Sequence, residues 1–168
     1  MKSAQEDEYL EFVAARAKEL YRSAYVLAAG DTHLAEDLVQ ETLARVYVHW
    51  KRVAGADSPA AYARTVLVRT FLSLRRRRST GERPLGNMPD SATSGPDTAL
   101  RLALMDALGQ LPPRDRAVLL LRYWEDRSIE ETAQMLRLSR SAVRSQGTRA
   151  LGRLRALLGD SLPDLVPH

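Results

Sequence analysis

The chain has 168 residues and a formal net charge of +4, and its content of 45% hydrophobic and 27% charged residues excludes a wholly disordered protein. The absence of cysteine excludes disulfides and thiolate metal sites, and three scattered histidines form no ligand cluster, so we expect no metal and no cofactor. No apolar stretch reaches the roughly 18 residues of a membrane span, and the acidic N-terminus lacks a signal-peptide run. We therefore expect a cytoplasmic protein without membrane insertion.

Three amphipathic helices are predicted in residues 1–78, because apolar residues recur there at helical spacing. The first helix ends at Gly30, Asp31 can cap the second, and the third begins near Ala60 and ends in the arginine run 75–78. The expected buried rows are Tyr9, Phe12, Val13, Leu20, Ala24 and Leu27 in the first, Val39, Leu43, Val46, Tyr47 and Trp50 in the second, and Ala63, Val66, Leu67, Thr70, Phe71 and Leu74 in the third.

Two of these helices also have a defined polar face. On the second helix Asp37, Gln40 and Glu41 fall together opposite the buried row, which is also what an ordinary solvated surface would look like. On the third helix an aromatic ring is combined with hydroxyls and cations, a mixture suited to base stacking and phosphate binding. Its members are Tyr62, Thr65, Arg69, Ser73 and Arg76, with Tyr62 equally acceptable in a core.

A linker is predicted over residues 79–97, where Gly, Pro, Ser, Asn and Asp replace the apolar periodicity. Its 19 residues could span about 60 Å when extended, roughly 18 base-pair steps of duplex DNA. Helical spacing resumes near residue 100, breaks at Pro112, and restarts with Pro113 in the first turn of a helix that reaches Trp124. We assign Trp50, Tyr123 and Trp124 to core packing.

Residues 128–155 have the pattern of a helix-turn-helix. Ser128 and Glu131 form a capping box that opens a helix over 129–136, a three-residue turn follows, and Ser139 can cap a final long helix that reaches about residue 158. The core-facing residues expected on that last helix are Val143, Gly147, Ala150, Leu151, Leu154 and Leu158.

Arginine dominates the second part of the chain. Residues 1–60 contain 10 acidic and 7 basic residues, whereas residues 61–168 contain 11 acidic and 18 basic residues, all of them arginine. A bias toward GC-rich codons would also produce arginine in place of lysine. Between Glu131 and Asp160, however, there are six arginines and no carboxylate, so the final helix projects an uncompensated positive field that favours DNA. A solvated basic helix in an ordinary bundle is the alternative.

Long segments of the chain resemble a known family. Residues 111–155 read LPPRDRAVLLLRYWEDRSIEETAQMLRLSRSAVRSQGTRALGRLR, which resembles the promoter-binding domain of extracytoplasmic-function (ECF) sigma factors of bacterial RNA polymerase, in the sigma-70 family. AEDLVQETLARVY (35–47), Trp50 and SPAAYARTVLVRTFLSLRRRR (58–78) are similar to that family's amino-terminal domain. The actinobacterial sigma-E-like subgroup is the nearest.

The resemblance implies an all-α protein of two small helical domains joined by a flexible linker. Sigma domain two is expected at 1–78, the linker at 79–97, sigma domain four at 98–160, and a tail at 161–168. The implied partners are core RNA polymerase, promoter DNA and an anti-sigma protein.

The resemblance also implies roles for individual residues. Asp37, Gln40 and Glu41 would dock on the clamp helices of the largest polymerase subunit. The melted minus-ten element would bind Tyr62, Arg69, Ser73, Arg75 and Arg76, although a solvated helix end also explains the arginines. The minus-thirty-five duplex would bind Arg140, Ser141, Arg144, Ser145, Thr148, Arg149 and Arg153 of the last helix.

Two positions depart from the family pattern. Arg69 stands where close relatives often have asparagine, and Arg137, in the turn, stands where glycine is usual.

We do not expect this protein to be an enzyme, because the sequence contains no phosphate loop, nucleophile motif or metal cluster. Binding energy rather than covalent chemistry would separate the DNA strands. The alternative function is a stand-alone helix-turn-helix regulator, which would explain only the carboxy-terminal third and would usually dimerise on a palindrome.

Overall fold

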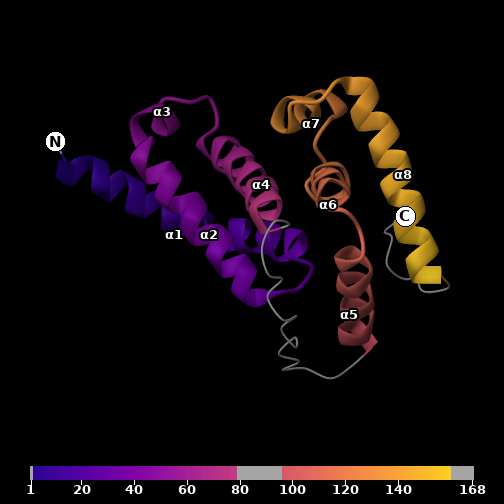
Figure 1. Cartoon of the computed structure of the whole chain (residues 1–168). Helices are drawn as coiled ribbons and strands as arrows, with labels where there is room; N and C mark the ends of the chain where they lie inside the picture. Colours follow the sequence, from indigo (N-terminus) through magenta and orange to yellow (C-terminus); the bar gives the residue numbers. More distant parts are fainter. Residues whose placement is uncertain (1, 79–95, 160–168) are drawn as a thin grey trace.

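A computed structural model describes residues 2–78 and 96–159 of the chain, except for the side chains of 2, 76–78, 96 and 97. The described residues form helices and no strand, which confirms the all-α prediction (Figure 1). The predicted tail and all but the last two residues of the predicted linker lie outside this description. The elements are α1 (Lys2–Leu27), α2 (Thr32–Val48), α3 (Trp50–Ala54), α4 (Pro59–Arg78), α5 (Pro96–Gly109), α6 (Pro113–Leu119), the π-helical η1 (Leu120–Trp124), α7 (Ile129–Leu136) and α8 (Arg140–Leu158).

The first domain is formed by α1 to α4. As predicted, α1 ends before Gly30, which has φ +86°, and Asp31 caps α2 by accepting a hydrogen bond from the Leu34 backbone N–H at 3.1 Å. Helix α2 packs against both α1 and α4, and the side chains of Leu38, Leu67 and Phe71 are fully buried between them. This packing gives α4 one fixed orientation, and with it the polar face on which strand binding is expected.

The predicted buried row of α2 was partly wrong. The residues buried on this helix are Leu34, Ala35, Leu38, Thr42 and Val46, which recur mainly at i, i+4 spacing. Tyr47 falls one position beyond this row and is 47% exposed, with its ring edge-on to Tyr9 at a centroid distance of 4.9 Å. Val39 and Leu43 are only partly buried.

The second domain is formed by α5 to α8. Pro112 and Pro113 break the helix as predicted, with Pro113 in the first turn of α6. The next segment, η1, is π-helical, and the Glu125 backbone N–H donates to the carbonyl of Leu120, five residues back, at 2.9 Å. The wider turn rotates the residues that follow relative to an α-helix. Tyr123 is therefore 52% and Trp124 42% exposed, so assigning them to the core was wrong, whereas Trp50 is buried.

The helix-turn-helix has the predicted local structure. Ser128 and Glu131 form both bonds of the capping box, α7 covers the predicted 129–136, and Ser139 accepts from the Ala142 backbone N–H at 3.1 Å at the start of α8. Between the helices Arg137 adopts the left-handed conformation, with φ 57° and ψ 46°. Only glycine takes up this conformation without a steric penalty from its side chain.

A test of this strain compares Arg137→Gly with Arg137→Ala. Both variants remove the same charge, but alanine retains the left-handed penalty, so the glycine variant should be more stable by about 1 kcal/mol. In thermal unfolding this corresponds to a melting temperature roughly 2–4 °C higher for a chain of this size. Equal melting temperatures for the two variants would show that the turn carries no strain.

Candidate nucleic-acid interface

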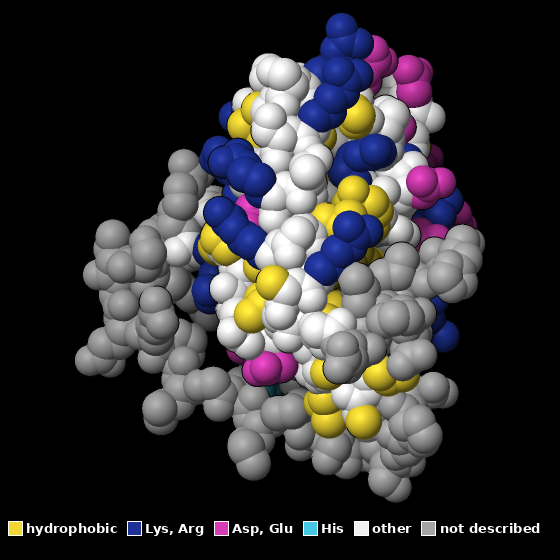
Figure 2. Space-filling view, turned by 90° about the vertical axis from the view of Figure 1, so that its right-hand side faces the viewer, with side chains coloured by type: hydrophobic (Ala, Val, Ile, Leu, Met, Phe, Trp, Pro, Cys, Tyr) yellow, Lys and Arg dark blue, Asp and Glu magenta, His cyan; other side chains and the backbone are white. Residues whose placement is uncertain are grey.

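Helix α8 separates its residues cleanly between two faces. Val143, Gly147, Ala150, Leu154 and Leu158 are buried as predicted, while Leu151 is only partly buried. Gly147 faces α6, where an added Cβ would lie 3.6 Å from the Val118 side chain. The opposite face is open to solvent and carries lysine or arginine side chains along its length (Figure 2). All seven residues predicted to bind the minus-thirty-five duplex are exposed: Arg140, Ser141, Arg144, Ser145, Thr148, Arg149 and Arg153.

The arginines on this face differ in how strongly they are held. Arg144 makes no hydrogen bond or ion pair with the residues that the structure describes, so its guanidinium is available to a ligand. Arg140 pairs with Glu130 at 2.7 Å, but both side chains are more than 60% exposed, and such pairs contribute little to stability. Among residues 2–78 and 96–159, the one acceptor for Arg149 is the Ser145 carbonyl of its own helix, at 3.4 Å.

Arg153 is held by a buried carboxylate that sequence reasoning missed. Asp115 of α6 is 2% exposed and accepts hydrogen bonds from Arg153 Nη1 at 2.6 Å and from Gln146 Nε2 at 3.2 Å. This carboxylate therefore fixes two α8 side chains and the contact of α8 with α6. Asp115 left no local signal, since an aspartate in the first turn of a helix is common on any surface.

The residues predicted to bind the minus-ten strand are less exposed to solvent than those predicted to bind the minus-thirty-five duplex. Tyr62, Ser73 and Arg75 are partly buried, and the side chain of Arg76 lies outside the described residues. Arg69 donates from Nε to the Met135 carbonyl at 2.9 Å and from Nη2 to the Gln134 carbonyl at 3.1 Å, and both acceptors belong to α7 of the second domain. Burial lowers the pKa of Arg69, and the nearby Arg137 cation lowers it further. This part of α4 is therefore occupied by the chain itself.

The predicted polymerase-docking face lies on the outside of α2. Asp37 and Gln40 are exposed, while Glu41 is half-buried and forms an ion pair with Arg45 at 2.9 Å. Arg45 lies one turn along the same helix, so this pair leaves the orientation of the face unchanged. The three residues lie on one face, as predicted.

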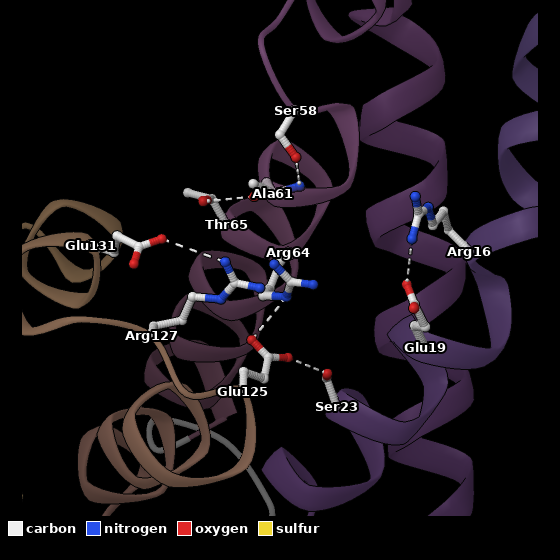
Figure 3. Close-up of polar contacts among 10 residues, drawn as sticks. All are labelled: Arg16, Glu19, Ser23, Ser58, Ala61, Arg64, Thr65, Glu125, Arg127 and Glu131. Carbon is white, nitrogen blue, oxygen red and sulfur yellow. Dashed lines mark hydrogen bonds and ion pairs between the residues drawn. The ribbon is translucent and has the colours of Figure 1, made fainter.

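The two domains are in contact along a charged boundary that the sequence did not reveal. Glu125, just after η1, accepts a hydrogen bond from Ser23 Oγ of α1 and forms an ion pair with Arg64 of α4 at 2.9 Å (Figure 3). Arg116 of α6 is 3% exposed and donates to the Leu27 carbonyl of α1 at 2.9 Å. We call the contacts of Arg69, Arg116 and Glu125 the interdomain seam.

A groove of about 1000 Å³ lies beside the seam. It is lined from the first domain by residues such as Leu20 and Arg64, and from the second by Leu104, Met105 and Trp124. The exposed ring of Trp124 thus faces this groove. Within the described part of the chain there is no group of three or more side chains able to hold a metal ion, and no helix with the length and apolar content to cross a bilayer.

Comparison with known proteins matches both domains. The profile described as Sigma-70 region 2 matches residues 8–80, and that described as Sigma-70, region 4 matches residues 101–154. The RNA polymerase sigma-E factor of Streptomyces avermitilis is 40% identical over 150 residues, covering 88% of this chain and 83% of the relative. The ECF RNA polymerase sigma factor SigL of Mycobacterium tuberculosis is 32% identical over 136 residues, covering 77% of each chain.

A solved structure has the same fold. The sigma factor RpoE, co-crystallised with the anti-sigma factor NepR from Bartonella quintana, aligns with a TM-score of 0.70 and 22% identity. The alignment covers 91% of this chain and 98% of that one, so the likeness extends over both domains.

The Asp115 network predicts a difference between two neighbouring arginines of α8. Arg153→Ala leaves the buried carboxylate without its charged partner and should lower the free energy of unfolding by about 2 kcal/mol. Arg149→Ala removes an arginine that has no tertiary partner among the described residues and should change the free energy of unfolding by less than about 0.5 kcal/mol. Urea unfolding of both variants measures the difference, and equal losses would contradict a structural role for Arg153.

Proposed function

The chain belongs to the extracytoplasmic-function sigma factors of the sigma-70 family, which bind core RNA polymerase and direct it to promoters, and from this premise we propose how the work is divided among its surfaces. The observation that carries the proposal is the exposed arginine and hydroxyl face of α8, opposite a row of buried residues. A helix held in this way can enter the major groove with its polar side chains toward the bases.

Helix α8 reads the minus-thirty-five duplex in this proposal. Arg144 near the start of the helix is placed to fork onto a guanine edge, because it is exposed and its guanidinium is not paired within the described residues. Ser141, Ser145 and Thr148 supply hydroxyls on the same face, and Arg149 is placed for phosphate. Arg153 has a smaller part in binding than the sequence suggested, since Asp115 already holds it.

Helix α4 binds the melted minus-ten strand in the same proposal. The ring of Tyr62 can stack on an unpaired base, and Arg69 and Arg75 supply cations for phosphate or base edges. Ser73 and Arg76 complete the predicted set. Strand separation is driven by binding free energy, so no covalent step is attributed to this chain.

The acidic face of α2 binds the clamp helices of the largest polymerase subunit in this scheme. Asp37 and Gln40 are exposed on one face with Glu41 beside them, which suits a basic or polar protein surface and disfavours DNA. The boundaries 1–78 and 98–160 are proposed for the two domains, with 79–97 as the connection between the two promoter elements. An anti-sigma partner and a cytoplasmic location also remain predictions.

Arg144→Ala tests the role of α8. The variant should bind a minus-thirty-five duplex roughly tenfold or more weakly, corresponding to the loss of about 1–3 kcal/mol for a bidentate base contact. Its binding to core polymerase should be unchanged. The promoter fragment would first be selected by transcription of genomic fragments with core polymerase and the wild-type chain, and affinities compared at one salt concentration by fluorescence anisotropy. Retained duplex affinity would remove Arg144 from the base-reading set.

Glu41→Ala tests the proposed polymerase-docking face of α2. Loss of this carboxylate should weaken binding to core polymerase while leaving the affinity of the free chain for the minus-thirty-five duplex unchanged. Co-purification with tagged core polymerase measures the first effect, and anisotropy measures the second. If Glu41→Ala and Arg144→Ala produced the same loss of nonspecific DNA affinity, this division between surfaces would be wrong.

A further inference from the structure

Arg137 lies in the turn between α7 and α8 and is held in the left-handed conformation by its neighbours. Its backbone N–H donates to the Gln134 carbonyl at 3.4 Å, and the Leu138 backbone N–H donates to the Ala133 carbonyl at 2.9 Å. These two bonds form the Schellman motif, which ends a helix with a residue of positive φ. Leu138 also packs against the core and Ser139 caps α8, so the turn is anchored immediately after Arg137 as well.

No contact in the described part of the chain accounts for an arginine at this strained position. The Arg137 side chain is exposed, and no hydrogen bond or ion pair joins it to the residues that the structure describes. Burial lowers the pKa of Arg69, and the Arg137 cation lowers it further, so the charge beside Arg137 is a like charge. Glycine would relieve both the steric penalty and this repulsion. An arginine that carries both penalties indicates a role outside the fold.

The helix-turn-helix brings this turn close to the DNA backbone. In this motif the first helix crosses the backbone, and the second lies in the major groove with its N-terminal residues at the base edges. The turn that joins the two helices therefore passes the edge of the groove, where the phosphates lie. Arg137 is in this turn, three residues before α8 begins at Arg140.

The arginine side chain is long enough to reach a phosphate from this position. The backbone from Arg137 to Arg140 spans at most about 11 Å, and the helix from Arg140 to Arg144 adds about 6 Å. The Cα atoms of Arg137 and Arg144 are therefore at most about 17 Å apart, and the major groove is about 12 Å wide. With Arg144 on a base edge inside the groove, Arg137 can extend to a phosphate on its rim.

The charges around the turn favour a polyanion as the partner. Residues 132–159 include six arginines and no carboxylate. Arg140 is bonded to Glu130 at 2.7 Å, whereas Arg137 and Arg144 have no such partner among the described residues. A surface of unpaired cations without carboxylates attracts the DNA backbone and repels basic protein surfaces.

Resting on the proposed function, we propose that Arg137 binds a phosphate of the DNA backbone at the edge of the minus-thirty-five element. The contact is electrostatic and independent of base sequence, so it adds affinity without adding specificity. It holds the start of α8 against one strand while Arg144 reads a base edge. Glycine would relax the turn but would leave this cation out.

Three substitutions at this position separate the charge from the strain. Arg137→Lys keeps both, Arg137→Ala keeps the strain alone, and Arg137→Gly removes both. At about 0.1 M salt, the alanine and glycine variants should bind the minus-thirty-five duplex roughly fivefold to tenfold more weakly than the wild type, and the lysine variant within about twofold of it. The glycine variant should melt no lower than the wild type, so unfolding does not explain its loss. Wild-type affinity in Arg137→Gly and Arg137→Ala would overturn the proposal.

The salt dependence of binding tests the charge contact. Losing one phosphate contact should reduce the slope of log affinity against log salt by about 0.9 in Arg137→Gly, so that its affinity and that of the wild type converge near 1 M salt. Arg101→Ala is the matched control, because it removes an exposed arginine without a partner among the described residues from α5, at the end of the domain away from α7 (Figure 1). Its slope should equal that of the wild type. Equal slopes for Arg137→Gly and Arg101→Ala would overturn the contact.

Neutral phosphates locate the contact on the duplex. A methylphosphonate placed at one backbone position at a time removes one negative charge. A single position at the edge of the element should weaken the wild type about as much as Arg137→Gly does, and should not weaken Arg137→Gly further. Additive losses at every position would overturn the proposal.

An unrelated duplex of equal length distinguishes failure of this contact from failure of the proposed function. Arg137→Gly should lose the same affinity for both duplexes, whereas Arg144→Ala should lose it mainly for the selected one. If Arg144→Ala has no effect while Arg137→Gly still loses affinity and slope, base reading by α8 is wrong and the phosphate contact stands. If Arg137→Gly weakens binding to core polymerase and leaves duplex affinity unchanged, the partner is a protein and the phosphate contact is overturned.

Discussion

The packing of α8 against α6 is the constraint on which the functional surface depends. Val143, Gly147 and Ala150 face inward, and the small residue at Gly147 accommodates the Val118 side chain. A helix has only one opposite face, so this packing determines where the exposed arginines point. The carboxylate of Asp115 adds a polar anchor, because it binds two α8 side chains from within the core. The face proposed to read bases therefore rests on packed helices rather than on a loop.

The seam occupies a charged residue that the resemblance assigns to DNA binding. Arg69 lies on the face of α4 expected to meet an unpaired strand, yet its guanidinium is occupied by α7 carbonyls. A carbonyl pair at a helix end and a nucleic-acid backbone both offer negatively polarised oxygens, so the same donors suit both.

Local patterns predicted local structure well. The capping box, the bounds of α7 and the buried row of α8 apart from Leu151 all follow from residues within a few positions of one another. Tyr47 was misplaced by one helical position, and Trp124 was misplaced because η1 breaks the α-helical phase. The seam joins residues far apart in the chain, such as Ser23 with Glu125, which are 102 positions apart, and no periodicity encodes such a pairing. The Asp115 network was missed for the same reason.

The central claim is that α8 reads one promoter element while the first domain, held on polymerase, acts at another. A nuclease footprint of the full chain with core RNA polymerase on a selected promoter tests it most directly. The account predicts an asymmetric footprint in which Arg144→Ala loses the upstream protection, while strand opening is detected downstream by permanganate. A two-fold symmetric footprint produced by the chain without polymerase would contradict the account.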